Sequence, residues 1–280
     1  MEEKIYSRAN KLNFLKILKL SVTDLFSSHF LAKQLAVRDI KAQYRQSFLG
    51  IFWMFITPVF TALVWVFLST SGTVKLSDTG VAYPVYVFIG TLVWSIITES
   101  INTPKNSTQG SMSIIAKINF PKEALILTGI YKLLFNSLVK LVLLILFLFV
   151  YDIGFHVSQL YFPLIIMGSV FFGITLGLLI TPISLIYHDI SKVVSIGLTF
   201  LMYVTPVVYT IPSANSAMKI LMTINPITPF IMTTRESLTG LDFTFMESFF
   251  WTLLLIIPVF FFALIIYRIS IPIIIERHGA

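Results

Sequence analysis

Residues 38–60 of the chain read RDIKAQYRQSFLGIFWMFITPVF. The first eight of these residues hold three basic side chains, Arg38, Lys41 and Arg45, together with one acid. From residue 48 onward the stretch becomes almost entirely apolar. A helix needs about 20 predominantly apolar residues to cross the hydrocarbon core of a bilayer. The stretch therefore predicts a charged segment that leads directly into a membrane span.

The composition of the whole chain also indicates a membrane protein. Hydrophobic residues make up 56% of the 280 residues and charged residues only 12%, whereas soluble domains carry about 25% charged residues. The chain has no cysteine, so disulfides and cysteine metal sites are excluded. The N-terminal residues lack a compact apolar core followed by a small-residue cleavage site, so we do not expect a signal peptide.

Six stretches are long and apolar enough, or nearly so, to be transmembrane helices. They are residues 51–70, 82–98, 124–151, 161–187, 193–211 and 245–267. The chain shows no succession of short alternating strands, which a transmembrane barrel would require. We therefore expect an all-α integral membrane protein with six transmembrane helices, in a domain that covers residues 50–268.

Basic residues are distributed unequally between the two sides of this domain. Residues 1–50 contain nine of them, and the segment between the second and third spans adds three more. The opposite side holds only three, among them Arg235. Because basic residues accumulate on the cytoplasmic side, we expect cytoplasmic termini, with an N-terminal segment at 1–29 and a tail at 269–280.

Residues 30–49 show a helical periodicity. At 100° per residue, five side chains fall within one arc of about 80°. These are Phe30, Val37, Ile40, Tyr44 and Phe48. Arg38, Lys41 and Arg45 form a basic ridge beside the arc. The pattern is typical of an amphipathic helix in the membrane interface, bending near Gly50 into the first span. Ordinary positive-inside flanking charges would look the same, and both interpretations stay open.

Residues 211–244 are nominally an outer loop but are too apolar for a solvated linker. We expect two short helices within 213–240, one capped by Ser213 and one that begins at Pro229 and ends at Gly240. Backbone that enters a membrane without spanning it is tolerated only when protein buries it or when it lines a wet cavity. We therefore predict a pair of re-entrant gate helices.

Lys140 lies about halfway along the third predicted span, and Asn136 lies one turn earlier on the same face. A charge at this depth costs several kcal/mol unless it meets water or a partner. We predict that Lys140 faces a wet cavity or an acid such as Glu99. Lys132 lies closer to the cytoplasmic end, where its side chain can reach the interface.

Five segments, in this order, resemble a known family. They are RDIKAQYRQSFLGIFWMFITP at 38–58, INTPKNSTQGSMSIIAKINFPKEAL at 101–125, IYHDISKVV at 186–194, YVTPVVYTIP at 203–212 and INPITPFIMTTRESLTG at 224–240. Together they resemble the membrane subunit, or permease, of ABC-2-type exporters of polysaccharides such as O-antigen, capsule and teichoic acid. The first segment and the Phe120-Pro121 pair are the most distinctive parts of the resemblance.

The resemblance implies a homodimer in the bacterial cytoplasmic membrane, each copy paired with a nucleotide-binding ATPase subunit. The chain would then be no enzyme, since ATP and Mg²⁺ would bind to the partner. In agreement, no Gly is followed five residues later by Gly-Lys-Ser or Gly-Lys-Thr, the phosphate-binding loop of such motors. The implied cargo is a glycan carried on a polyprenyl pyrophosphate.

The resemblance also assigns roles to individual residues. It implies a coupling helix at about 105–118 that touches the ATPase. A turn fixed by Pro121 would transmit a movement of this helix to the third span, whereas the alternative is a cytoplasmic loop in which the proline merely begins a helix. The coupling residues would be Lys117, Phe120, Pro121, Lys122 and Glu123. The basic ridge, with Tyr44, would meet either the pyrophosphate of the cargo or anionic lipid head groups. Around a channel between the first and fifth spans, the lining would include Trp53, Phe55, Phe200, Tyr203 and Tyr209.

Other functions fit less well. A teichoic acid exporter or an ABC-2 exporter of small molecules or lipids remains close to the same resemblance. A secondary transporter would need buried carboxylates or internal repeats, which the sequence does not show. A membrane-embedded enzyme would need a catalytic group, and His188-Asp189 is the only adjacent His/acid pair. We interpret that pair as a loop turn in which Asp189 caps the next helix. No metal site and no nucleic-acid partner are expected.

Overall fold

The computed structural model describes residues 14–45, 52–72, 79–115, 117–118, 120–212 and 216–279. These residues form helices and turns without a strand, which confirms the all-α prediction. In chain order the helices are α1 (Phe14–Ser27), α2 (His29–Arg45), α3 (Phe52–Thr70), α4 (Tyr83–Gly110), α5 (Met112–Ile115), α6 (Glu123–Val150), the 3₁₀ helix η1 (Val157–Tyr161), α7 (Phe162–Ile186), α8 (His188–Tyr203), α9 (Ala217–Ile224), α10 (Thr228–Thr239) and α11 (Met246–Gly279).

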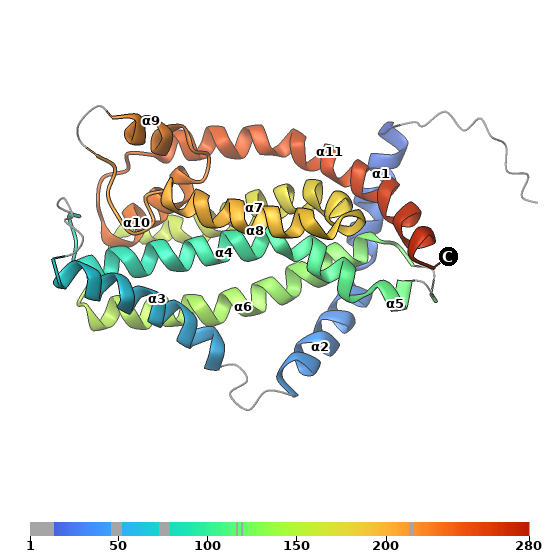
Figure 1. Ribbon diagram of the computed structural model, residues 1–280, viewed down its shortest axis with the longest axis horizontal. Coiled ribbons are helices and arrows are strands. Elements are labelled where there is room, and N and C mark those ends of the chain that lie inside the picture. Colours follow the sequence, from blue (N-terminus) through green and yellow to red (C-terminus); the bar gives the residue numbers. More distant parts are fainter. Residues whose placement is uncertain are drawn as a thin grey trace, which may run out of the picture.

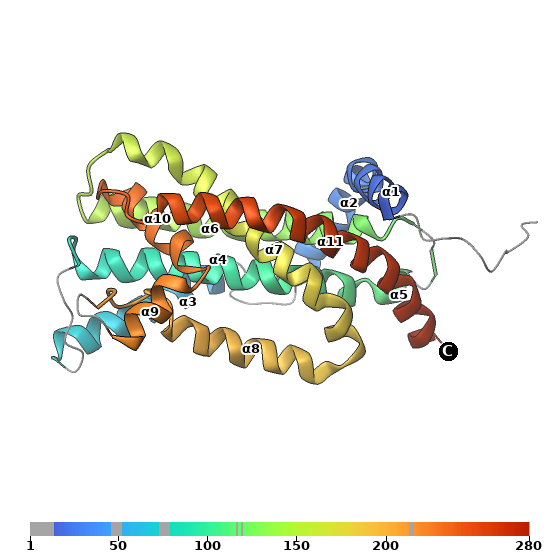
Figure 2. The ribbon, with the colours of Figure 1, turned by 90° about the horizontal axis from the view of Figure 1, so that it is seen from above.

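The long helices run side by side along one axis of the molecule (Figure 1). The helix α4 is the central one, since it packs against α3, α6, α7 and α10, and α7 in turn packs against α11. Figure 2 shows α8 at the edge of this bundle, where it contacts α7. The short helices α9 and α10 lie at one end of the bundle, and α1, α5 and the C-terminal end of α11 lie at the other (Figure 1).

Four of the described helices are long and apolar enough to cross a membrane. They cover Tyr83–Gly110, Glu123–Val150, Val157–Ile186 and Met246–Glu276. The chain is thus a helical membrane protein. The two remaining predicted spans correspond to α3, whose apolar part is Phe55–Thr70, and to the 16-residue α8. That the chain has six spans therefore stays a prediction.

The fifth predicted span, 193–211, was placed too far along the chain. The helix α8 begins at His188 and ends at Tyr203, and residues 204–209 form turns and bends. Pro206 explains the end, because a proline disfavours helical backbone at the residue before it. Asp189 lies in the first turn of α8 and Tyr187 is the N-cap, so the prediction that Asp189 caps this helix was wrong by two positions.

The second span and the coupling helix also differ from the prediction. The helix α4 continues from Tyr83 to Gly110, through the expected end of the span at 98, and takes in the first part of the predicted coupling helix at 105–118. A separate helix remains only at α5, Met112–Ile115. The polar second half of α4 stays helical because its hydroxyls find partners inside the bundle. Ser107, for example, donates a hydrogen bond to the carbonyl of Leu125.

Close approach between α4 and α7 depends on two glycines spaced four residues apart. A Cβ on Gly173 would lie 2.5 Å from Cβ of Ser100, and one on Gly177 would lie 2.3 Å from the carbonyl oxygen of Ile101. Neither space admits a side chain. Small residues at this spacing are a common means of packing transmembrane helices closely.

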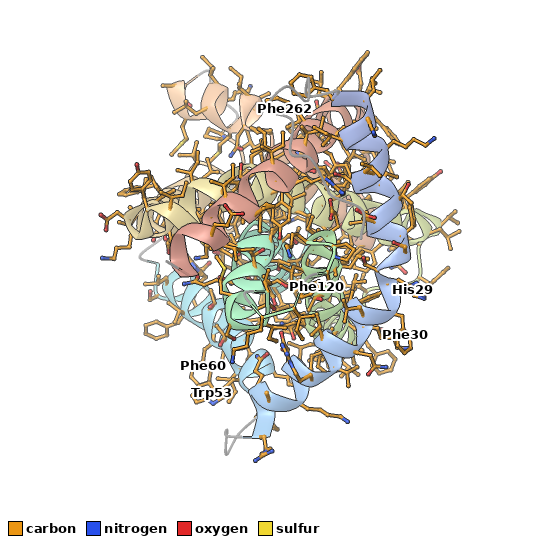
Figure 3. The ribbon with its side chains drawn as sticks, turned by 90° about the vertical axis from the view of Figure 1, so that its right-hand side faces the viewer. His29, Phe30, Trp53, Phe60, Phe120 and Phe262 are labelled. Atoms are coloured by element: carbon orange, nitrogen blue, oxygen red, sulfur yellow. The ribbon has the colours of Figure 1, made fainter. Side chains whose placement is uncertain are left out.

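The N-terminal segment and the tail are more helical than expected. Within the predicted segment 1–29 the chain forms α1, and within the predicted segment 30–49 it is helical up to Arg45, as α2; that this helix lies in the membrane interface stays a prediction. Phe48 and the expected bend near Gly50 lie outside the described residues. The predicted tail at 269–280 continues α11 to Gly279. Figure 3 views this end of the bundle and shows α1 and α2 lying across it.

The segment 213–240 contains two short helices, as predicted, namely α9 and α10. Pro229 lies in the first turn of α10, and Gly240 ends it in the left-handed conformation with φ of 71°. The cap of α9 is Ser216, whose hydroxyl accepts a hydrogen bond from the backbone of Lys219. Ser213, the predicted cap, lies outside the described residues. Since α10 is buried almost throughout, it is no solvated loop.

Candidate functional site

A cavity of about 470 Å³ lies among α2, α3, α4, α6 and α8. Its polar lining includes the amide of Gln43 and five short hydroxyl side chains, those of Thr57, Thr61, Thr91, Ser95 and Thr98. The aromatic rings of Trp53 and Trp94 border it as well. Trp53 is 55% exposed and lies at the rim of the bundle in Figure 3, so the cavity opens to the surface of the subunit.

One wall of the cavity carries an ion pair with a third polar partner. Nζ of Lys140 lies 2.7 Å from Oε2 of Glu99, and Nδ2 of Asn136 donates to Oε1 of the same carboxylate over 2.5 Å. The Lys140 side chain is only 11% exposed and that of Glu99 29%. The prediction that Lys140 meets an acid such as Glu99 is therefore confirmed, and Lys140 also borders the cavity. Its charge is compensated inside the bundle, as burial at this depth requires.

A second, smaller cavity of about 180 Å³ adjoins the first. Gln43, Glu99 and Asn136 border both cavities, and the smaller one extends to Lys132. Polar groups thus continue from the middle of α6 to the helix pair formed by α2 and α6. There, Lys132 forms an ion pair with Asp39 of α2 at 3.1 Å.

Of the five predicted channel-lining aromatics, only Trp53 borders the large cavity. Phe55 is half-buried on α3. Phe200 and Tyr203 are 69% and 48% exposed on α8, and the hydroxyl of Tyr209 donates to the carbonyl of Tyr203. That Phe55, Phe200, Tyr203 and Tyr209 line a passage between two subunits stays a prediction.

The structure also places Trp94 and neighbouring residues of α4 in the lining of the large cavity. The sequence reasoning did not predict this lining. A usable signal was present in the sequence. Thr91, Ser95, Thr98 and Glu99 recur at spacings of three and four in an otherwise apolar span, and they form one polar stripe on a helix.

The predicted basic ridge lies on α2. Arg38 forms an ion pair with its neighbour Asp39 at 2.6 Å, so its guanidinium is partly engaged already. Lys41 and Arg45 are exposed, and the side chain of Tyr44 lies outside the described residues. The helix α2 packs against the bundle through small residues, since Ala32 and Ala36 are buried. Phe30, in contrast, is 67% exposed and lies at the rim in Figure 3. This apolar face is available to lipid.

The predicted coupling residues lie at the end of the bundle that carries α1 and α5. Phe120, Pro121, Lys122 and Glu123 together border a cavity of about 370 Å³. Its other wall comes from α11, through Arg268 and Pro272. Lys117 is exposed nearby and does not border this cavity. Burial lowers the pKa of Lys122, and the adjacent Glu123 carboxylate opposes that shift.

Arg268 joins three helices at this end. Its Nη1 lies 2.6 Å from Oε1 of Glu123 in α6 and 2.7 Å from Oδ2 of Asp24 in α1. The Glu123 side chain is nearly fully buried. The residue before Arg268 in α11, Tyr267, shares a hydrogen bond of 2.7 Å with Thr108 of α4. We call Arg268, Glu123 and Asp24 the three-helix clasp. Sequence reasoning missed the clasp because Arg268 looked like a flanking charge.

Arg235 is a second buried cation. It was counted by sequence among the basic residues of the side opposite the termini, and in the structure its side chain is 1% exposed within α10. Its Nη2 donates to the carbonyls of Tyr86, Pro206 and Val207 over 3.0–3.3 Å, and its guanidinium lies 3.4 Å from the centre of the Tyr86 ring. Arg235 thus ties α10 to α4 and to the turn after α8.

No group of three or more His, Asp or Glu side chains that could hold a metal ion occurs within the described part of the chain.

Comparison with known proteins identifies the family. The model of the ABC-2 type transporter family matches residues 31–239. The chain belongs to this family. The matched range starts in α2 and ends with α10, so it includes the large cavity, the coupling residues and Arg235. As a member of this family, the chain is a membrane component of a transporter and not an enzyme.

Individual relatives carry more specific names. The chain is 26% identical over 219 residues to the O-antigen export system permease protein RfbA of Myxococcus xanthus, covering 78% of this chain and 83% of the relative. Two proteins of the same name from Klebsiella pneumoniae are each 25% identical over 201 residues, covering 71% of this chain and 76% of each relative. The resemblance found in the sequence motifs is thereby confirmed.

Proposed function

We propose that this chain is the permease subunit of an ABC transporter that exports a lipid-linked polysaccharide, of the O-antigen kind, across the bacterial cytoplasmic membrane. The observation that carries the proposal is the similarity to three O-antigen export permeases over more than two thirds of the chain. The polar, tryptophan-bearing cavity within an otherwise apolar bundle supports it, because a glycan needs hydrogen-bonding groups at membrane depth.

Energy comes from a partner in this proposal. Two copies of the chain pair with two ATPase subunits, which bind ATP and Mg²⁺ on the cytoplasmic side. The contact for the ATPase is the end of the bundle with Lys117, Phe120, Pro121, Lys122 and Glu123. The clasp supports this assignment, since a movement of the α6 start is passed through Arg268 to α11 and α1.

The distribution of charges and the arrangement of the helices support an orientation. Nine basic residues precede residue 51, and α1, α5 and the C-terminal end of α11 lie at the same end of the bundle (Figure 1). This end faces the cytoplasm in our proposal. The opposite end, with α9 and α10, gates the outer side, and Arg235 fixes α10 to the turn that follows α8.

Transport proceeds by movement of α3 relative to α8. ATP binding on the partner displaces the cytoplasmic end of the bundle, the two helices part, and the lipid-linked glycan enters. Arg38, Lys41 and Arg45 lie at the interface and attract the pyrophosphate of the carrier lipid.

A gene deletion tests the proposal. Loss of the polysaccharide from the cell surface, with accumulation of the lipid-linked glycan inside and recovery upon expression of the chain, is the expected result. Unchanged surface polysaccharide in the deletion strain would refute it. Expression of the Lys192→Gln variant serves as a control, because Lys192 forms only an exposed ion pair with Asp189.

A further inference from the structure

The hydroxyl groups that line the large cavity already donate their protons in hydrogen bonds to the backbone. Each of five hydroxyls donates to a carbonyl of its own helix, three or four residues earlier. The bonds are Thr57 to Trp53 (3.1 Å), Thr61 to Thr57 (2.9 Å), Thr91 to Val87 (2.8 Å), Ser95 to Leu92 (2.7 Å) and Thr98 to Trp94 (3.0 Å). A hydroxyl has one proton to donate but two lone pairs. These side chains therefore offer acceptors to whatever enters the cavity.

The cavity wall that carries Lys140 and Glu99 also offers mainly hydrogen-bond acceptors. The carboxylate of Glu99 is an acceptor, and the Lys140 ammonium is compensated by Glu99 at 2.7 Å. The pair carries no net charge. Apart from the N–H groups that remain on Lys140, the donors at the wall are the neutral amides of Gln43 and Asn136 and the indole N–H groups of the two tryptophans.

The acceptor-rich lining selects the chemistry of a ligand. A phosphate offers only acceptors, so it would meet the lone pairs of five hydroxyls and the negative charge of Glu99. A buried polar group without a partner costs about 1–3 kcal/mol. A sugar residue instead presents several hydroxyls that both donate and accept, and its apolar C–H face suits the rings of Trp53 and Trp94.

We infer that this cavity is a binding site for uncharged sugar residues of the cargo, and not for the phosphate groups of its lipid carrier. The inference rests on the proposed function. Glu99 accepts hydrogen bonds from sugar hydroxyls, while Lys140 and Asn136 hold the carboxylate in place and neutralise it. The two ends of the cargo are then held separately, with the phosphate at the interface and the glycan in the cavity.

The absence of cysteine from the chain permits a direct test by thiol labelling. Single cysteines are introduced at Thr57 and Ser95 in the cavity, and at Asp189, an exposed residue outside it, as a control. The full chain is purified with its partner, and labelling rates with a small thiol reagent are measured. The probes are neutral oligosaccharides of glucose, galactose and mannose, and inorganic pyrophosphate.

A bound ligand lowers the free fraction of its site by a factor of 1 + [L]/Kd. At a ligand concentration of twice the dissociation constant, we therefore expect about threefold slower labelling of Thr57→Cys and Ser95→Cys. At least one oligosaccharide has this effect, pyrophosphate has none, and Asp189→Cys is unaffected by either. Protection by pyrophosphate alone would overturn the inference. Absence of protection by any oligosaccharide would overturn it as well.

A charge variant adds a second criterion. Glu99→Gln leaves Lys140 uncompensated, so pyrophosphate should now protect the cavity cysteines while sugar protection weakens. Lys192→Gln, at an exposed ion pair, serves as the matched control and changes neither. If Glu99→Gln leaves both protection patterns as they were, Glu99 does not determine the selectivity and the inference is refuted.

The deletion strain separates this inference from the proposed function. Loss of surface polysaccharide in that strain, combined with absence of sugar protection, refutes the inference alone. Unchanged surface polysaccharide refutes the proposed function whatever the labelling shows.

Discussion

The ammonium group of Lys140 lies 2.7 Å from Oε2 of Glu99, and this ion pair joins α6 to α4 inside the bundle. Both side chains border the large cavity. A lone cation at this depth of a membrane protein is costly, and the pair removes that cost without closing the cavity. The same two residues therefore stabilise the helix pair and set the charge of the candidate binding site.

Replacement of Lys140 by Met should destabilise the protein more than removal of both charges. Removing one partner of a buried ion pair costs about 3–5 kcal/mol, and since Glu99 is 29% exposed we expect about 2 kcal/mol. The double variant Lys140→Met/Glu99→Gln should recover more than half of this loss. Thermal unfolding of the detergent-purified chain measures both.

Lys192→Met is the matched control for this cycle. Its ion pair with Asp189 spans 3.8 Å, and both side chains are largely exposed, so the unfolding temperature should not change measurably. Equal destabilisation by Lys140→Met and Lys192→Met would contradict the buried ion pair.

The contact between α4 and α7 can be tested by adding a single methyl group. In Gly177→Ala the new Cβ would lie 2.3 Å from the carbonyl oxygen of Ile101, so the helices must separate. Overpacking of this kind costs about 1–3 kcal/mol. Gly197→Ala is the control, because no atom lies within 4 Å of its Cβ. Unfolding temperatures should fall for the first variant only, and equal behaviour would exclude the close approach.

The three-helix clasp should matter for coupling. Arg268→Gln leaves the buried Glu123 carboxylate without its cation, which costs about 1–3 kcal/mol. In our proposal it also lowers the stimulation of the partner's ATPase by the permease. Arg268→Lys retains a charge and should keep part of the stability. Both effects are measured in the purified complex, as ATPase activity and as unfolding temperature. Wild-type values of both for Arg268→Gln would show that the clasp transmits no movement.

The basic ridge should contribute to export. Replacement of Arg38, Lys41 and Arg45 together by Gln is expected to lower the amount of polysaccharide on the cell surface, since the carrier pyrophosphate loses its partners. A charge-preserving variant, Arg38→Lys/Arg45→Lys, separates two causes. It exports normally if the ridge only attracts anionic head groups, and poorly if the guanidinium fork binds phosphate. Normal export by the triple Gln variant would exclude an anion-binding role.

The sequence predicted most reliably those elements that apolar length alone determines. The third span was expected at 124–151 and α6 covers Glu123–Val150. The contact of Lys140 was also predictable, because few acids lie in the spans and Glu99 is one of them. In both cases one strong local term, either hydrophobicity or an uncompensated charge, decides the structure.

Elements held by distant partners were not predictable in this way. The turn after α8 is held by Arg235, which binds the carbonyls of Pro206 and Val207 from a helix about 30 residues later in the chain. The polar half of α4 depends on α6 and α11, through Ser107 and Thr108. Such long-range hydrogen bonds leave no periodic trace, so Arg235 and Arg268 looked like ordinary loop and flanking charges.

The assignment as a permease subunit can be tested by affinity purification of the tagged chain from its native membrane, followed by identification of the bound proteins and assay of ATPase activity. Our account predicts a stoichiometric partner with a phosphate-binding loop, and ATPase activity that falls in the Arg268→Gln variant. A pure homo-oligomer, free of any ATPase under conditions that preserve other membrane complexes, would contradict the assignment as the permease subunit of an ABC exporter.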